Sequence, residues 1–366
     1  MKPLMAVALS GGIDSLIATK ILIQQGHPVV GIHFVTGYEN PVHPSPRKLA
    51  ELLSSRLGID VYAMDAVQPF QETVVNYFVR TYLSGLTPNP CMVCNPLIKF
   101  GTVLDYARSL GASHLATGHY ARIASDANGI RRLFKGIDPV KDQSYFLSRM
   151  TQTQLAHACF PLGGMTKTQV IQLAKDLELQ PVQHGESQDI CFIKGRTYGQ
   201  FLMNQKGFVS PSGPIVTVAG KIIGEHAGLH LFTIGQRRGI NCPAAQPYYV
   251  VRLDRKTDTL VVGFKSDLLA FSCRVSDINW IAGPQAFPAR VYTRLRYRSQ
   301  AVGSTLYRGG PDGGVAVVFD DPQPSITPGQ GAVFYREDGE VMGGGWICGK
   351  TKVPPKSRHI FDKIKQ

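Results

Sequence analysis

The sequence has no apolar run long enough to cross a bilayer, and this absence argues against a membrane-spanning helix. It also lacks the leader of a secretory signal and the arginine-rich character of a transit segment, so we predict a cytoplasmic location and no membrane partner. Internal repeats and low-complexity tracts are missing as well. The 366 residues, 43% of them hydrophobic, are therefore expected to build two or three domains with cores of their own.

Cysteine and acidic residues are scarce. The 7 cysteines, an odd number in a chain without an export signal, predict reduced thiols, and any exceptional cysteine is expected to be catalytic and not structural. Only 26 acidic residues face 39 lysines and arginines, which gives a net charge of +13 and a pI near 9.4. This imbalance favours a polyanionic partner, with a charge that serves only solubility as the alternative.

Strand-like and helix-like runs alternate up to about residue 120. The expected strands cover residues 4–9, 29–35, 61–64 and 114–117, and the expected helices cover residues 15–25, 46–57, 70–83 and 97–110. Such alternation is typical of βαβ units, so we predict an α/β fold with a doubly wound parallel sheet at the N-terminal end.

The character of the sequence changes farther along the chain. Residues 151–204 are helical in pattern, whereas short β-branched and aromatic runs from about residue 207 predict one or two small β-barrels. A boundary between two β modules is expected near residues 273–277. The predicted division is an α/β domain over residues 1–204, a central β-rich domain over 205–276, a C-terminal β-barrel over 277–352 and a basic tail over 353–366.

The run Ser10-Gly11-Gly12-Ile13-Asp14-Ser15 follows the first predicted strand and precedes the first predicted helix. Consecutive glycines allow a sharp turn that exposes backbone N–H groups, and the helix behind directs its positive end at the same point. Asp14 is suited to hold Mg²⁺ or to cap the helix. The lysine of a kinase-type P-loop is absent, which argues against γ-phosphoryl transfer. The loop resembles that of the PP-loop ATP pyrophosphatases, with an ordinary strand-to-helix turn as the alternative.

Cys91 and Cys94 have C-x-x-C spacing within residues 87–95, between two predicted helices. This spacing has three interpretations: half a zinc site, a redox pair, or a nucleophile with a neighbour. The remaining cysteines stand alone in the sequence, so a second ligand pair for zinc is lacking. Cys191, taken by itself, reads as a buried thiol in a short strand.

Several motifs, taken in order and spacing, resemble one family, the bacterial tRNA-specific 2-thiouridylases of the MnmA/TrmU type. They are SGGIDS at residue 10, TPNPCMVCN at 87 followed by Lys99-Phe100, ATGHYAR at 116, KDQSY at 141, SQDICFI at 187, TIGQRRG at 233, Arg296-Tyr297-Arg298, and TPGQ at 327 followed by Gly343-Gly344-Gly345. The resemblance covers nearly the whole chain. Residues 36–46 depart from it, because they lack the cysteine and acidic cluster that the family usually carries there.

The resemblance implies an ATP-dependent sulfurtransferase that acts on C2 of the wobble uridine of tRNA. ATP would adenylate the C2 oxygen and release pyrophosphate, with Mg²⁺ as a second cofactor. Cys191 would carry the sulfur as a persulfide on a mobile loop. Cys94 would act as the nucleophile, either by closing a disulfide with Cys191 or by handling a freed sulfide equivalent, and the sequence leaves both routes open. Cys91 is expected to pack and not to react.

The same resemblance assigns binding residues and partners. The nucleotide would be held by Ala8, Leu9, Ser10, Gly11, Gly12, Ile13, Asp14, Ser15, Phe34 and Gly118, with Asp14 also catalytic. The tRNA or its target base would be contacted by Asn89, Pro90, Cys91, His119, Lys141, Asp142, Gln143, Arg296, Tyr297 and Gln330. The tRNAs would be those for Lys, Glu and Gln, and the sulfur donor a cysteine desulfurase or a sulfur-relay protein.

Residues 290–298 give independent support for RNA binding. Period-two alternation predicts that Arg290, Tyr292, Arg294, Arg296 and Arg298 share one face of a strand, where they would suit phosphate contact and base stacking. A charged edge strand is the alternative. Two other functions remain open, an ATP-dependent amidating synthetase acting on a small molecule and an RNA-binding protein with ATP as a structural ligand.

Overall fold

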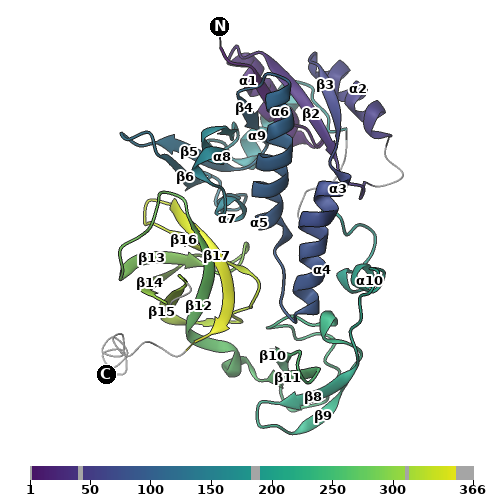
Figure 1. Cartoon of the computed structure of the whole chain (residues 1–366), viewed down its shortest axis with the longest axis vertical. Helices are drawn as coiled ribbons and strands as arrows, with labels where there is room; N and C mark the ends of the chain where they lie inside the picture. The colour runs from purple at the N-terminus through teal and green to yellow at the C-terminus, as the bar shows by residue number, and fades with distance from the viewer. Residues whose placement is uncertain (1, 40–43, 183–189, 310–312, 352–366) are drawn as a thin grey trace.

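The computed structural model describes residues 2–39, 44–182, 190–309 and 313–351, and the predicted basic tail lies outside them. Within these residues no helix is long and apolar enough to cross a membrane. The N-terminal part contains a five-stranded parallel sheet in the order β3-β2-β1-β4-β7 (Figure 1). Its strands are β1 (Met5–Ala8), β2 (Val29–Val35), β3 (Val61–Asp65), β4 (His114–Ala116) and β7 (Ala158–Cys159).

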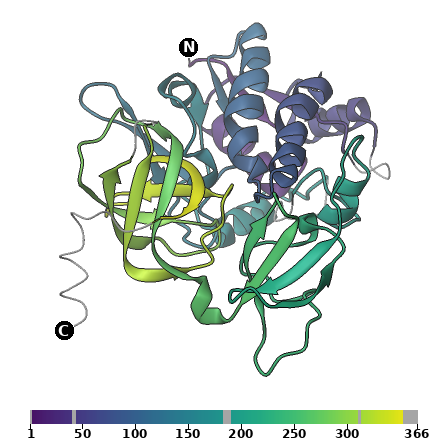
Figure 2. The same ribbon diagram turned by 60° about the horizontal axis from the view of Figure 1, so that its bottom comes forward.

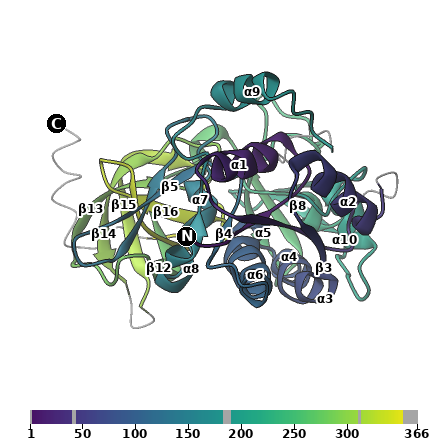
Figure 3. The same cartoon turned by 90° about the horizontal axis from the view of Figure 1, so that it is seen from above.

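Helices cover both faces of this sheet. Core packing places α1 and α2 on one face, and the view from above shows α9 beside α1 and α6 on the opposite side (Figure 3). The helices that complete this part are α1 (Ile13–Gln24), α2 (Pro46–Leu57), α3 (Val67–Phe70), α4 (Asn76–Leu83), α5 (Pro90–Cys94), α6 (Leu104–Ser109), α7 (Ser144–Leu147), α8 (Gln152–Ala156), α9 (Lys167–Asp176) and α10 (Tyr198–Met203). The predicted doubly wound sheet is confirmed.

Two wider helical segments continue the helices on the second face. The π-helical segment η1 (Gln71–Val75) joins α3 to α4, and η2 (Asn95–Val103) joins α5 to α6 without a break. Pro96 lies near the start of η2, where its missing N–H and its ring disturb the regular hydrogen-bond ladder. The wide turns of η2 therefore begin directly after Cys94.

The central part is a four-stranded sheet in the order β10-β11-β8-β9, with the short helices η3 and η4. Figure 2 shows this teal and green part beside the yellow-green C-terminal part. A small apolar core lies within it, built around Val250, Leu260 and Val262. The elements are β8 (Gly213–Thr217), β9 (Ile222–His226), η3 (Leu229–Leu231), β10 (Tyr249–Asp254), β11 (Thr259–Gly263) and η4 (Lys265–Leu268).

The C-terminal part is a closed barrel of six antiparallel strands in the order β12-β15-β14-β13-β16-β17, closed by pairing between β12 and β17. Since β12 is continuous through the boundary expected near residues 273–277, that boundary is wrong and the barrel begins at Leu269. The strands are β12 (Leu269–Trp280), β13 (Ala289–Arg294), β14 (Val302–Arg308), β15 (Val315–Pro324), β16 (Gly331–Tyr335) and β17 (Glu340–Lys350).

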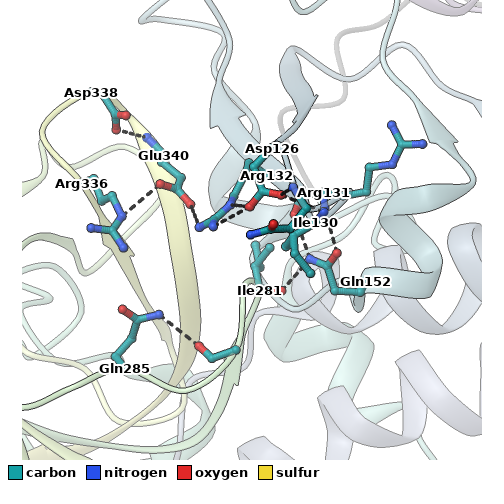
Figure 4. Close-up of polar contacts among 12 residues, drawn as sticks. Asp126, Ile130, Arg131, Arg132, Gln152, Ile281, Gln285, Arg336, Asp338 and Glu340 are labelled. Atoms are coloured by element: carbon teal, nitrogen blue, oxygen red, sulfur yellow. Dashed lines mark hydrogen bonds and ion pairs between the residues drawn. The ribbon is translucent and has the colours of Figure 1, made fainter.

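The barrel sheet extends into the N-terminal part. Hairpin β5 (Ala121–Ser125) and β6 (Arg131–Lys135) follows β4 in the chain, and β6 pairs with β17. Arg132 on β6 donates to Glu340 on β17 at 2.8 Å and to Asp126 at 2.7 Å (Figure 4). The N-terminal part and the barrel are therefore joined by a shared sheet as well as by the chain.

The predicted arginine face is wrong in its second half. Strand β13 ends at Arg294, so Arg296 and Arg298 lie in the loop that follows and not on the strand. The side chains also have partners within the protein, because Arg290 forms a bidentate pair with Asp320, and Arg294 pairs with a buried aspartate. A continuous row of basic side chains offered to RNA is therefore absent from this strand.

Candidate active site

The Gly11-Gly12 turn links the carboxyl end of β1 to helix α1. Gly11 has φ +78°, a left-handed conformation that glycine adopts without strain, and Gly12 is the N-cap of α1. The Ser15 hydroxyl donates to the Gly12 carbonyl at 2.9 Å. The Ser10 hydroxyl oxygen lies 3.5 Å from the Ser15 hydroxyl oxygen. The loop thus presents backbone N–H groups and hydroxyls at a helix N-terminus, an arrangement that binds phosphate.

Asp14 is engaged by two residues from distant parts of the chain. Its Oδ1 accepts from the Lys167 ammonium at 2.7 Å and from the Tyr120 hydroxyl at 2.8 Å. Lys167 is the first residue of α9, which Thr166 caps through a reciprocal pair of hydrogen bonds with Gln169. Sequence reasoning missed Lys167, since nothing in residues 160–170 signals that this lysine reaches the glycine loop.

The other predicted nucleotide residues surround the same loop. Ala8 and Leu9 are buried at the end of β1, Ile13 opens α1, and Phe34 is half-buried near the end of β2. At Gly118, a Cβ atom would lie 3.0 Å from the Asp14 backbone carbon and 3.1 Å from the Ser15 nitrogen. The structure therefore brings Gly118 against the loop, where only a residue without a side chain fits comfortably.

The C-x-x-C segment forms the short helix α5. The buried Asn89 side chain caps it by accepting from the Met92 N–H, and Pro90 occupies its first turn. Cys94, half-buried, ends the helix, and Cys91 is exposed one turn earlier. Desolvation raises the pKa of Cys94 to about 12 and that of Cys91 to about 11, and the charge of Cys191 adds to both rises.

The chain around Cys191 lies close to α5, because Ile190 and Phe192 pack in the same apolar cluster as Cys94, although about a hundred residues separate them in sequence. The pKa of Cys191 is raised by burial of the sulfur among protein atoms, while the residue retains exposed surface. The next residue, Phe192, is 2% exposed. Its ring packs on the rings of Phe70 and Phe78, with centroids 5.8 and 5.2 Å away. Phe192 therefore fixes the chain on one side of Cys191, and the preceding part of the expected loop, residues 183–189, lies outside the described residues.

Lys99 brings a positive charge to this group of thiols. Its ammonium lowers the pKa of Cys91, Cys94 and Cys191 against the effect of desolvation. It also contacts His119 Nε2 at 3.3 Å. Burial and the Lys99 charge hold the pKa of His119 well below its ordinary value, so its ring is neutral near pH 7.

The predicted tRNA residues at 141–143 lie at the turn that leads into α7, of which Gln143 is the N-cap. Asp142 is 2% exposed, and its carboxylate accepts from the Gly136 and Ser144 N–H groups and from Arg294. Gln143 accepts from the Tyr120 N–H at 3.1 Å. Asp142 thus holds the turn together, and Lys141, which follows Val140 at the surface, is half-buried.

The barrel residues predicted to contact tRNA lie against the same part of the molecule. Tyr297 packs on Phe146 with ring centroids 4.4 Å apart, and Arg296 donates to the Ser325 carbonyl and the Thr327 hydroxyl. The Gln330 side chain donates to the carbonyls of Thr87 and Pro88, just before α5. These residues thus lie near the N-terminal end of α5.

The donor set at the glycine loop suits Mg²⁺ held mainly by nucleotide phosphates. Asp14 offers a carboxylate there, and Mg²⁺ is commonly bound by one or two carboxylates together with substrate phosphates and water. In the described ranges, no group of three or more His, Cys, Asp or Glu side chains is arranged to hold a metal ion on its own.

Comparison with known proteins covers almost the entire chain. Family models described as the tRNA methyl transferase HUP domain, the tRNA methyl transferase PRC-barrel domain and the aminomethyltransferase beta-barrel domain match residues 4–195, 200–264 and 271–347. These matches follow the three parts of the fold. The division that they place between residues 264 and 271 agrees with the start of β12.

Two relatives illustrate the similarity. The chain is 50% identical over 345 residues to the tRNA-specific 2-thiouridylase MnmA of Desulfosudis oleivorans, which covers 94% of this chain and 95% of the relative. It is 41% identical over 353 residues to the protein of the same name from Geobacter metallireducens, covering 93% and 95%. With this identity along nearly the full length of both proteins, the chain belongs to the family of tRNA-specific 2-thiouridylases.

Proposed function

We propose that this protein uses ATP to replace the C2 oxygen of a tRNA wobble uridine with sulfur, as its membership of the thiouridylase family indicates. The observation that carries the proposal is that Cys94 packs in one apolar cluster with Ile190 and Phe192, the neighbours of Cys191, in a chain whose Gly11-Gly12 turn at a helix N-terminus suits phosphate. An amidating synthetase would need no paired thiols. The family relationship and the thiol group together disfavour that alternative.

The first step makes the uridine reactive. The C2 oxygen attacks the α-phosphorus of ATP, pyrophosphate leaves, and the oxygen becomes part of AMP, which is a good leaving group. Gly11, Gly12 and Ser15 would grip the pyrophosphate through N–H and hydroxyl donors, with Lys167 supplying a positive charge. Mg²⁺, held by the phosphates with Asp14, would neutralise the charge that develops on them.

The second step transfers sulfur. The terminal sulfur of a Cys191 persulfide forms a bond to C2 as the bond from C2 to AMP breaks. The Cys94 thiolate then attacks the Cys191 sulfur, which releases 2-thiouridine and leaves a Cys94–Cys191 disulfide for a thiol reductant to reopen. In the second route, Cys94 attacks the persulfide first and the freed hydrosulfide attacks C2. Both routes require the two thiols within disulfide range.

The substrate tRNAs are proposed to be those for Lys, Glu and Gln, and the sulfur donor a cysteine desulfurase or a relay protein. The surroundings of α5 supply candidate RNA contacts in His119, Lys141 and Tyr297. His119 is largely buried behind Lys99, so its contact with RNA would be made only at the target base.

The test is mass analysis of nucleosides from tRNA incubated with the protein, ATP, Mg²⁺, cysteine and a cysteine desulfurase. We expect 2-thiouridine with the natural protein and none with Cys94→Ser or Cys191→Ser, while ATP and tRNA affinities stay within about twofold. Cys348→Ser, which alters an exposed barrel thiol, serves as the matched control. Full activity in either site variant contradicts the two-thiol scheme.

A further inference from the structure

Lys99 is a half-buried lysine, and no carboxylate of the described chain lies within ion-pair distance of its ammonium. Burying a charge without an anion is costly, so such a lysine ordinarily acquires an ionic partner. Its ammonium contacts the neutral imidazole of His119. Lys99 lies five residues after Cys94, and the i→i+5 period of the π-helical segment η2 places the two side chains on the same face. Ile190 and Phe192, on either side of Cys191, pack in the same apolar cluster as Cys94, and the Lys99 charge accordingly lowers the pKa of Cys91, Cys94 and Cys191. Among the described residues, no carboxylate is therefore paired with Lys99, and three thiols that can become anionic lie in its part of the structure.

The ammonium is held by a short chain of hydrogen bonds. Lys99 has only donors, so His119 Nε2 must accept from it at 3.3 Å, and the proton of the neutral ring resides on Nδ1. Nδ1 then donates to the Thr117 hydroxyl at 2.6 Å. The ring itself makes an edge contact with Phe160 and a tilted contact with Phe100, with centroids 5.8 and 6.5 Å apart. His119 is thereby held in one orientation and fixes the position of the Lys99 ammonium.

We propose that Lys99, supported by His119 and Thr117, is the counter-ion that stabilises the anionic sulfur of Cys94 and Cys191 during sulfur transfer. This role rests on the proposed function and adds a residue to it. It solves a physical difficulty of the site, because desolvation favours the neutral thiol whereas only the thiolate is nucleophilic. In this role His119 positions Lys99, which is distinct from the RNA contact expected from the sequence.

Other charged groups also shift the pKa values of Cys94 and Cys191, and their effects remain when Lys99 is replaced. Lys194 lowers the pKa of Cys191 and Glu39 raises it, and the thiolates of Cys91 and Cys191 each raise the pKa of Cys94. Lys99 and Lys194 both lower the pKa of Cys191, whereas Lys99 is the cation that lowers the pKa of Cys94. Loss of Lys99 is therefore expected to affect Cys94 more strongly than Cys191.

The experiment measures thiol ionisation in the full chain without ATP or tRNA. The rates at which iodoacetamide alkylates each cysteine are followed by peptide mass analysis between pH 7 and 10. In Lys99→Met we expect alkylation of Cys94 to be about tenfold slower at every pH below its pKa, as for a rise of one pKa unit. Lys99→Arg should stay within about threefold of the natural protein, and Lys175→Met, on the exposed side of α9, should be unchanged.

Two other cysteines serve as internal references. Exposed Cys348 should react equally in all variants, and buried Cys273 should stay unreactive unless the variant unfolds. If Lys99→Met unfolds, His119→Gln provides the second test, with slower alkylation of Cys94 expected. Unchanged alkylation of Cys94 in a folded Lys99→Met protein overturns the proposal, including the case in which ATP binding weakens and Lys99 is a phosphate ligand. Since the assay needs no turnover, its outcome is independent of whether tRNA is thiolated.

Discussion

The side-chain amide of Gln330, in the barrel, donates to the carbonyl of Pro88 at 2.8 Å, just before the helix that carries Cys94. The same amide reaches the Thr87 carbonyl at 3.2 Å, and the Thr87 N–H donates to the Pro328 carbonyl at 3.0 Å. At Gly329, with φ +88°, a Cβ atom would lie 2.8 Å from the Thr87 oxygen. The barrel therefore positions the start of α5 by direct backbone contact.

Gln330→Ala should weaken this positioning. It removes both side-chain hydrogen bonds and leaves part-buried carbonyls unpaired, at a cost of about 1–2 kcal/mol in unfolding free energy. Because the glutamine acts through α5, the single-turnover rate of thiolation should fall while ATP affinity is unchanged. Gln323→Ala, whose side chain bonds only the nearby Asp321 carbonyl, is the control. A loss of tRNA affinity with unchanged stability would instead favour the direct tRNA contact expected from the sequence.

Gly118→Ala should impair nucleotide binding. The added methyl would approach the Asp14 backbone at 3.0 Å, closer than ordinary van der Waals contact, so the start of α1 must shift. Overpacking of this kind costs about 1–3 kcal/mol, and the shift displaces the N–H groups of the glycine turn. Calorimetric titration with a non-hydrolysable ATP analogue should show an affinity at least about tenfold lower. Gly164→Ala, at a position with open space, should bind the analogue normally.

Arg132→Met should loosen the barrel from the N-terminal part. The guanidinium bridges Asp126 and Glu340, and the Glu340 side chain is only 9% exposed, so the variant leaves a nearly buried carboxylate with Arg336 as its remaining cation (Figure 4). We expect about 2 kcal/mol less stability in urea unfolding. The exposed pair Arg47–Glu51 offers a comparison, and Arg47→Met should change stability by less than about 0.5 kcal/mol. Equal effects of the two substitutions would contradict the bridging role.

The sequence predicted those features that local pattern determines. The alternation of apolar runs predicted β2 over Val29–Val35 and α2 over Pro46–Leu57 with the bounds observed, and the fold class follows from that alternation. The glycine turn was equally readable, because a strand, two glycines and a helix follow one another in the chain.

Features made by distant residues were not predictable in this way. Nothing near Arg294 indicates that it pairs with Asp142, 152 positions away, and this pairing removes an arginine from the expected RNA face. Likewise, β6 resembles any short strand until its partner β17 is known. Lys99 and Lys167 acquire their roles only through His119 and Asp14, which folding brings to them.

The buried thiols should make the protein sensitive to alkali. Burial raises the pKa of Cys159 to about 11 and raises the pKa of Cys273 as well. A cysteine thiol in the unfolded chain has a pKa of about 8.5. A group with a raised pKa in the folded state stabilises fully below its unfolded pKa and loses that contribution as pH rises toward its folded pKa. Unfolding free energy should therefore fall between about pH 8.5 and pH 11, by at most about 1.4 kcal/mol per pH unit for each thiol.

Urea titrations between pH 8 and 10.5 measure this slope. Cys159→Ala should make it shallower, because the variant lacks one of the shifted groups, even though its stability at pH 8 is lower. Cys348→Ala removes an exposed thiol and should leave the slope unchanged. The same slope in all three proteins would show that other groups, such as the buried tyrosines, govern the alkaline loss.

Lys167→Met should reduce affinity for ATP. The ammonium, 15% exposed, lies 2.7 Å from Asp14 at the helix end where the phosphates are proposed to bind, and it brings a positive charge that the glycine turn itself lacks. Phosphate oxygens compete well with a carboxylate for such a donor, so the lysine is available to a bound nucleotide. We expect about tenfold weaker binding of a non-hydrolysable ATP analogue in the presence of Mg²⁺. Lys175→Met, in the last turn of the same helix α9, removes the same single positive charge from the protein and should bind the analogue normally. Unaltered affinity in Lys167→Met, together with a lower thermal stability, would mean that the lysine serves only to hold Asp14.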